Sequence, residues 1–402
     1  MASRFHQIDQ FVRERTEESM NRLIAATRER EFDAEELHHL ADAMARSGNL
    51  LEWPSTEIAA DLASTGGPTS LSTLLGPLYL RTRGLIVPKL GVPGRPAGGI
   101  DVLAQLPGYR TALTTPEIRT IVTRCGYVHF LADKGSAPLD ALLFHYRQRV
   151  GAQNIPSLAI SSLLAKKIAC GVKFVGLDVR VAPHGNFGGT FIEAGQSARK
   201  FCAAARIASI RAVALLTDGR SPYQPFIGRG EALLALKTIF DGKAVSALAE
   251  HDHRCRLMAA HIASLTEGSI SQTTNKTISS IFIENIKAQG SSVEAFEKKV
   301  VSVTAGHRNE FVAKTDGFFS VDIAALRSTF ADVHSKSDRQ FPDEFGVILR
   351  AAPGSYVKRG ELLATVRAND SDWPILRVSL ANIFRTDKLI EYAPGLEETI
   401  RG

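Results

Sequence analysis

The chain has 402 residues, of which 44% are hydrophobic and 22% are charged, a balance typical of globular proteins with two or three domains. Its 48 basic residues exceed the 42 acidic ones, which gives a formal net charge of +6 without a dense run of lysine and arginine. This charge suits small anionic ligands and gives no reason to expect a nucleic acid as partner.

Four cysteines are spread along the chain without a Cys-x-x-Cys pair: Cys125, Cys170, Cys202 and Cys255. Neither a disulfide framework nor a zinc ribbon is therefore expected, and the compartment is predicted to be reducing. The N-terminal segment carries charges where a secretion signal needs an apolar core, and three lysines interrupt the longest apolar stretch, residues 155–182. We expect no membrane-spanning segment and a cytoplasmic location.

The first part of the chain combines helices with loops rich in glycine and proline. Residues 8–48 place apolar side chains at helical spacing and predict a small helical module. Glycine and proline become dense over residues 56–110, which predicts loops close to a ligand site. Two further helices are predicted over residues 139–150 and 156–170, the second of which opens with a proline and stops before a glycine.

Strand patterns dominate the rest of the chain. Two β-branched runs, residues 172–181 and 211–219, predict buried strands, and a predicted helix over 194–208 separates them. This alternation indicates an α/β sheet that binds ligands at the carboxyl ends of its strands. Beyond about residue 300 the pattern indicates a small α+β module. Its short strands are expected at residues 311–315, 317–322, 346–351 and 362–367.

A loop built to cradle an anion follows residue 63. It offers hydroxyl groups and a backbone without side-chain obstruction, contributed by Ser64, Thr65, Gly66, Gly67, Thr69 and Ser70. The cations that normally accompany such a loop are missing, because Leu62 and Ala63 stand just before it. An ordinary strand-to-helix turn is the alternative interpretation.

A second glycine-rich segment, residues 89–101, carries Lys89 and Arg95. These two cations would complete an anion site together with the first loop. The alternative is a solvated surface loop.

A hydroxyl and two cations are expected to converge from the predicted helices. Ser162 and Lys166 are four residues apart on an otherwise apolar helix, so they share one face. With Arg147 they would suit the carbonyl groups and ring N–H of a pyrimidine. In the alternative interpretation, Lys166 extends its ammonium group to solvent and Ser162 bonds within its own helix.

Two histidine-bearing segments are weaker candidates. His251 and His253 are two residues apart and would lie on different faces of a helix, and no further ligand pair has matching spacing, so no metal site is expected. His184 follows a predicted strand, where active-site loops occur, although a turn histidine is the alternative.

Taken in order, these segments resemble the class II pyrimidine nucleoside phosphorylases, the thymidine phosphorylase family. Residues 64–71 resemble the end of that family's phosphate loop, Lys-His-Ser-Thr-Gly-Gly-Val-Gly-Asp-x-Thr-Ser-Leu, and residues 162–167 resemble its Ser-Ile-Leu-Ala-Lys-Lys helix. The spacing from Arg147 to Ser162 and from Ser162 to Lys166 agrees with the family without a gap. The resemblance therefore implies that these three side chains hold a pyrimidine base.

The resemblance also implies an architecture and a set of partners. The expected fold class is α/β, with a small all-α domain, a larger α/β domain with a central mixed sheet, and a C-terminal α+β module. A homodimer is expected, and the only small molecules expected are a pyrimidine nucleoside or nucleotide and phosphate as a co-substrate, without a metal or another cofactor. The domains would be residues 1–55 with 139–170, residues 56–138 with 171–302, and residues 303–402.

The departures from the family pattern concentrate in the phosphate half of the site. Leu62 and Ala63 replace the lysine and histidine of the phosphate loop, which is also two residues short. Residues 91–99 lose the serine and the final threonine that contact phosphate in the family. The sequence thus predicts a pentosyltransferase that cleaves the N-glycosidic bond of a pyrimidine nucleoside or nucleotide, with phosphate or another acceptor. The alternatives are a phosphate-independent hydrolase or transferase and a non-catalytic nucleoside-binding protein.

Overall fold

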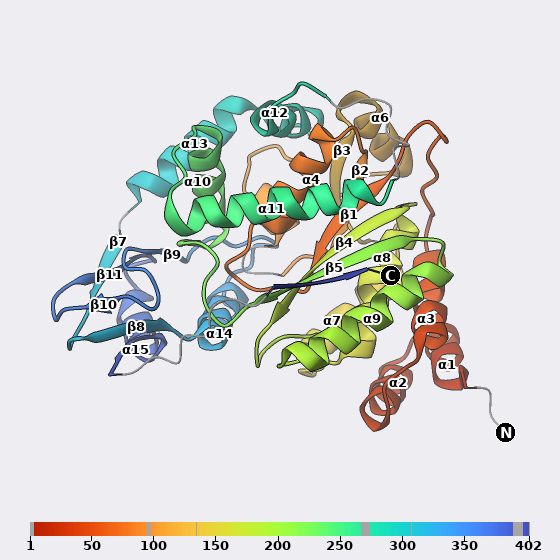
Figure 1. Cartoon of the computed structure of the whole chain (residues 1–402), viewed down its shortest axis with the longest axis horizontal. Helices are drawn as coiled ribbons and strands as arrows, with labels where there is room; N and C mark the ends of the chain where they lie inside the picture. The colour runs from red at the N-terminus through yellow and green to blue at the C-terminus, as the bar shows by residue number, and fades with distance from the viewer. Residues whose placement is uncertain are drawn as a thin grey trace.

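A mixed sheet lies at the centre of the fold, with its strands in the order β1-β4-β5-β13 (Figure 1). This computed structural model describes residues 4–94, 98–133, 135–266, 274–306, 308–388 and 397–401. The first three strands are parallel, and β13 runs antiparallel to β5. The four strands are β1 (Ala60–Ser64), β4 (Phe174–Val181), β5 (Arg211–Asp218) and β13 (Glu397–Arg401).

A second, parallel pair of strands extends this sheet beyond β1. The pair consists of β2 (Val87–Gly91) and β3 (Tyr127–Leu131). A parallel bridge between Ala59 and Ile86 joins the start of β1 to the start of β2. The carboxyl ends of β1, β2 and β4 therefore lie at one edge, where the glycine-rich loops follow them.

The two faces of the central sheet belong to separate apolar cores, because alternate residues of a strand point to opposite sides. On one face Val175 and Leu177 pack against a first layer of helices. On the other face Leu62, Val213 and Leu215 pack against a second layer. Each β-branched run thus contributes apolar side chains to both cores, as buried parallel strands do.

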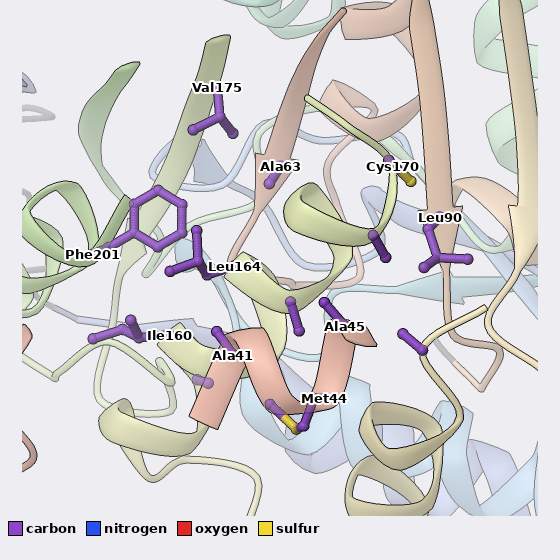
Figure 2. Close-up of a cluster of buried hydrophobic side chains, with 14 of the residues drawn as sticks. Ala41, Met44, Ala45, Ala63, Leu90, Ile160, Leu164, Cys170, Val175 and Phe201 are labelled. Atoms are coloured by element: carbon purple, nitrogen blue, oxygen red, sulfur yellow. The ribbon is translucent and has the colours of Figure 1, made fainter. Parts of the chain in front are cut away.

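The first core joins the helical layer to the sheet. Its helices are α1 (His6–Glu14), α2 (Glu17–Glu29), α3 (Ala34–Arg46), α7 (Pro138–Arg149), α8 (Pro156–Ala169) and α9 (Phe191–Ile207). Figure 2 shows Ala41 of α3, Leu164 of α8 and Phe201 of α9 gathered with Val175 of β4. This packing fixes α8, and with it one wall of the site described below.

The helices of the second core cover the opposite face of the sheet and the β2–β3 pair. They are α4 (Ser72–Thr82), α5 (Gly99–Leu103), α10 (Arg229–Phe240), α11 (Ser246–Ser264), α12 (Ile278–Ala288) and α13 (Val293–Ala305). The helix α6 (Thr115–Cys125) contacts β3 and α12, but its buried apolar side chains belong to the first core. Gly176 of β4 allows α11 to approach the sheet closely, since a Cβ atom there would lie 2.4 Å from Ile262.

The C-terminal module has two small antiparallel sheets, ordered β6-β9-β11-β7 and β10-β8-β12. Its strands are β6 (Phe226–Ile227), β7 (Arg308–Val312), β8 (Gly317–Val321), β9 (Gly346–Leu349), β10 (Tyr356–Val357), β11 (Leu362–Arg367) and β12 (Phe384–Asp387). Its helices are α14 (Ile323–Ser335) and α15 (Trp373–Ile383).

A buried ion network ties this module to α10. The carboxylate of Glu231 accepts hydrogen bonds from Arg367, at 2.9 and 2.8 Å, and from Arg308, at 3.0 Å. Arg367 also reaches Asp343. Gly346, the first residue of β9, lies so close to Glu231 that a side chain at this position would collide with the carboxylate.

The architecture confirms the predicted α/β fold class with a helical layer, a central mixed sheet and a C-terminal α+β module. The strands and helices expected along the chain are present with bounds shifted by a few residues. The domain boundaries stay a prediction, and two short strands cross them: β6 pairs with β9 of the C-terminal module, and β13 returns to the central sheet. Over the described ranges, no helix combines the length and the apolar character needed to cross a bilayer.

Candidate active site

One cavity of about 140 Å³ brings together five of the side chains that the sequence singles out. These are Ser64, Lys89, Arg147, Ser162 and Lys166. Its walls also include Gly91, His129, Phe144, Gln153, Leu163 and Asn186. The cavity lies where the carboxyl ends of β1 and β2 meet α7 and α8, which is the edge at which open α/β sheets bind ligands.

Lys166 and Ser162 face this cavity as a bonded pair. The ammonium group of Lys166 donates to the hydroxyl and to the carbonyl oxygen of Ser162, each at 2.9 Å. It also forms an ion pair with the buried carboxylate of Asp140, which lies in the first turn of α7. The ring of Phe144 lies 6.0 Å from the same nitrogen. The shared helix face predicted from the four-residue spacing is thereby confirmed.

Arg147 lines the cavity, but its guanidinium group braces the turn between α7 and α8. It donates to the backbone carbonyl oxygens of Ala152, Gln153 and Leu158 at 3.0, 2.9 and 3.1 Å. Burial lowers the pKa of Arg147 to about 10, so the group keeps its positive charge at neutral pH. Arg147 thus holds in place the turn that presents Gln153 to the cavity.

A shared carboxylate fixes two further lysines behind the anion loop. Asp61 accepts from Lys89 at 2.6 Å and also pairs with Lys167, and all three side chains are buried. Burial by itself would raise the pKa of Asp61, but the charges of Lys167 and Lys89 hold it well below its usual range. Lys89 donates a second hydrogen bond to the carbonyl oxygen of Leu62 at 2.7 Å. A cation therefore reaches the start of the anion loop, although neither Leu62 nor Ala63 supplies one.

The charges of the described residues around the cavity do not cancel. Four basic side chains line the cavity, Lys89, Arg147, Lys166 and Lys167, whereas only two carboxylates, those of Asp61 and Asp140, pair with them in the described structure. Burial lowers the pKa of His129 well below its usual value, and the charge of Lys89 lowers it further, so this wall residue is neutral. The cavity thus carries an excess of positive charge that favours an anionic ligand.

The predicted anion loop is divided between two places. Ser64 lines the cavity just described, whereas Thr65, Gly66, Gly67 and Thr69 line a smaller adjoining one. Ser70 points elsewhere and donates to the hydroxyl of Ser72 at 3.0 Å. The glycines are needed for the bend, since their φ angles are 102° and 128°.

Arg180 of β4 occupies the concave side of this loop. Its guanidinium group donates to the carbonyl oxygen of Gly66 at 3.0 Å and to Ser72 at 3.2 Å, and it pairs with Asp178. Its backbone N–H donates to the hydroxyl of Thr65 at 3.0 Å. A Cβ atom on Gly67 would lie 2.9 Å from this guanidinium group. The loop therefore encloses a cation of its own chain.

Three comparisons with known proteins bear on this geometry. No family model matches the chain. It is 27% identical to a pyrimidine-nucleoside phosphorylase of Geobacillus stearothermophilus, over 94% of this chain and 90% of that protein. It is 25% identical to an AMP phosphorylase of Methanococcus maripaludis (strain C6 / ATCC BAA-1332), over 87% and 70%, and 25% identical to a pyrimidine-nucleoside phosphorylase of Staphylococcus haemolyticus (strain JCSC1435), over 84% and 81%. The chain is thus similar to nucleoside and nucleotide phosphorylases over most of its length, at 25–27% identity.

Two solved structures are similar to the chain at lower identity. Anthranilate phosphoribosyltransferase from Thermus thermophilus is 13% identical with a TM-score of 0.48, over 74% of this chain and 99% of that one. The enzyme from Saccharomyces cerevisiae is 13% identical with the same TM-score, over 75% and 91%.

The structure brings some of the predicted site residues together and leaves others apart. The predicted base-binding trio of Arg147, Ser162 and Lys166 lines one cavity. Arg95 lies outside the described residues, and Lys89 is paired with Asp61. The roles of these residues in binding stay predictions. Across the described segments, no group of three or more His, Cys, Asp or Glu residues is arranged to hold a metal ion.

Sequence reasoning missed the partners of these cations. Asp140, in the first turn of the predicted helix 139–150, was not identified as the partner of Lys166. Asp61 and Lys167 are adjacent in sequence to Leu62 and Lys166, but no pattern in the sequence predicted that they pair with each other. The contact of Arg180 with the anion loop was also missed, because nothing in the sequence pointed from that strand to the loop.

His251 contacts the end of the anion loop and makes the stability of the folded protein depend on pH. Its Nε2 accepts the N–H of Leu71 at 2.9 Å, and its ring stacks on Tyr223 at 5.5 Å between centroids. Burial and the charge of Arg180 lower the pKa of His251 from 6.5 to about 3. The unfolded chain therefore binds this proton at a higher pH than the folded protein does, and stability is lost as the pH falls from about 6.5 toward 3.

The variant His251→Gln keeps an acceptor for Leu71 but cannot titrate. We expect its free energy of unfolding to fall less steeply with decreasing pH than that of the wild type, by up to about 1.4 kcal/mol per pH unit. Urea denaturation at a series of pH values between 4 and 7 measures both slopes. Equal slopes for the two proteins would contradict the assignment of a buried neutral imidazole.

Proposed function

We propose that the protein is a pentosyltransferase that cleaves the N-glycosidic bond of a pyrimidine nucleoside or nucleotide, with the base held in the cavity between α8 and the ends of β1 and β2. One observation carries the proposal. Ser162, Lys166 and Arg147 line the same cavity as Ser64 and Lys89, in a relative of the nucleoside phosphorylases. The cytoplasmic location and the homodimer expected from the sequence stay predictions.

The chemistry of the bond supports a role for these groups. Cleavage leaves negative charge on the departing base and builds positive charge on the sugar. The ammonium group of Lys166 is fixed by Asp140 and Ser162, so it is already oriented when charge develops on a base oxygen beside it. Ser162 would orient the ring, and Arg147 would hold the adjoining turn and add its charge to the wall.

The acceptor is proposed to be phosphate. The excess positive charge of the cavity and the position of Lys89 beside Leu62 support an anion close to Ser64, at the start of the loop. Leu62 and Ala63 favour a second candidate function, a protein that binds a nucleoside without turnover, because they leave the loop without side-chain cations. A hydrolase that uses water is the third outcome of the same test.

The test is an assay of base release with purified full-length protein. Uridine, thymidine, cytidine and their 5′-monophosphates are incubated with and without phosphate, and the free base and sugar products are separated by chromatography. Phosphate-dependent release with formation of a sugar 1-phosphate is the expected result. Release that persists in phosphate-free buffer would show hydrolysis, and absence of release from every substrate, with a nucleoside still raising the thermal stability, would show a binding protein.

A further inference from the structure

The smaller cavity beside the base site contains an arginine that has no charged partner among the described residues. Arg327 of α14 faces this cavity together with Arg180, His184 and Tyr223. Within the described part of the chain, its one hydrogen bond is a long one, to the side-chain oxygen of Gln153 at 3.5 Å. Burial lowers the pKa of Arg327, and no described carboxylate offsets that effect. Burying a guanidinium group without a counter-charge costs folding free energy, and an anion bound beside it would reduce that cost.

The other residues around this cavity leave that charge uncompensated. Arg180 is neutralised by Asp178, and none of the described lining residues is an aspartate or a glutamate. Asp322 lies near His184, but its carboxylate caps α14 by accepting the N–H of Ala325 at 3.0 Å. Of the two arginines that line the cavity, Arg180 therefore has a carboxylate partner, and Arg327 has none among the described residues.

This small cavity adjoins the base site. Ser64 lines the larger cavity, and its neighbour Thr65 lines the smaller one. Likewise Asn186 lines the larger cavity, and its neighbour Gly185 lines the smaller one. Gln153, which lines the larger cavity, is the residue that Arg327 contacts. The side-chain oxygen of Asn186 is buried without a hydrogen-bond partner in the described structure, which marks the boundary between the two cavities as incompletely satisfied.

We propose that Arg327, with His184 and the Gly66–Gly67 bend, forms a subsite for a phosphate group next to the base cavity. The volume of the small cavity is about 20 Å³, enough for a single water molecule, so a phosphate group enters only if a side chain moves. Arg327 is suited to move, because it is held by one long contact. Leu62 and Ala63 do not supply a cation for the anion, and Arg327 of α14 would supply one in their place. The role of this subsite in turnover rests on the proposed function.

A phosphate group at this place has two sources, inorganic phosphate as the acceptor or the phosphoryl group of a nucleotide substrate. Isothermal titration calorimetry of the full-length protein with inorganic phosphate, uridine and uridine 5′-monophosphate distinguishes them. The variant is Arg327→Gln, and the matched control is Arg385→Gln, which changes an exposed arginine of β12 in the same module. Arg327→Lys tests whether the charge alone is sufficient.

We expect Arg327→Gln to weaken the binding of at least one phosphate ligand by about tenfold or more, as loss of a charge-assisted hydrogen bond does. Uridine binding and the control should stay within about twofold of the wild type, and Arg327→Lys should recover part of the loss. A loss for inorganic phosphate identifies the acceptor, and a loss for the nucleotide alone identifies the substrate phosphoryl group. Equal affinities of wild type and Arg327→Gln for both ligands, or no binding of either by the wild type, would overturn the proposal. Loss of phosphate binding without any uridine binding would retain the subsite and reject the proposed function.

Discussion

Replacing Asp61 with asparagine is expected to lower the free energy of unfolding by about 3–5 kcal/mol, the usual cost of removing one partner from a buried ion pair. The carboxylate of Asp61 neutralises Lys89 and Lys167, and all three groups are buried behind the anion loop. An amide at this position leaves two ammonium groups in the interior without a counter-charge. Chemical denaturation at neutral pH measures the difference.

A matched surface variant separates this effect from a general loss of charge. Asp42→Asn removes an aspartate that pairs with Arg46 on an exposed helix face and is expected to cost no more than about 1 kcal/mol. The pKa of Asp61 is held below its usual range, so its contribution is present above the ordinary aspartate pKa and is lost as the pH falls below it. A loss for Asp61→Asn no larger than that for Asp42→Asn would contradict the assigned ion cluster.

Replacing Lys166 with methionine is expected to lower kcat for base release by about 10²–10³-fold, the range seen when one preorganised donor is removed from a catalytic site. Methionine keeps much of the length of the side chain but cannot stabilise negative charge on a departing base. Steady-state kinetics on whichever nucleoside or nucleotide is turned over fastest gives the comparison. Lys173→Met, at an exposed position just before β4, is the matched control and should retain wild-type activity.

The buried partner of Lys166 requires a second variant. Lys166→Met alone leaves the carboxylate of Asp140 without its ion-pair partner, which by itself would destabilise the fold. The double variant Asp140→Asn, Lys166→Met removes both charges and should recover stability while remaining inactive. Recovery of activity in the double variant would show that Lys166 serves only the stability of the fold.

Local patterns in the sequence predicted the elements and the shared faces correctly. The four-residue spacing of Ser162 and Lys166 on an apolar helix led directly to a bonded pair, because helix geometry fixes that relation. The β-branched runs that became β4 and β5 were equally clear, since buried parallel strands need apolar side chains on both faces.

Relations between distant segments were beyond local patterns. Asp61 pairs with Lys167, 106 positions away, and Arg180 donates to the carbonyl oxygen of Gly66, 114 positions away. Nothing in helix or strand periodicity selects such partners, because they depend on how the strands are ordered in the sheet. For the same reason the sequence treated residues 64–70 as one anion loop, whereas the sheet and Arg180 divide that loop between two cavities.

The cations near the anion loop could also be identified only from the fold. The sequence shows that Leu62 and Ala63 are not cations, but only the fold shows that Lys89 reaches the backbone of Leu62 and that Arg327 of α14 faces the adjoining cavity. Cationic side chains near the anion loop therefore come from β2, β4 and α14, none of which is adjacent to the loop in sequence.

A crystal structure of the protein with a bound pyrimidine nucleoside would show directly whether the cavity holds the base. We expect the base beside Ser162 and Lys166, with the sugar directed toward Ser64. A base bound elsewhere, or a cavity that stays free of base at a nucleoside concentration that saturates binding in solution, would contradict it.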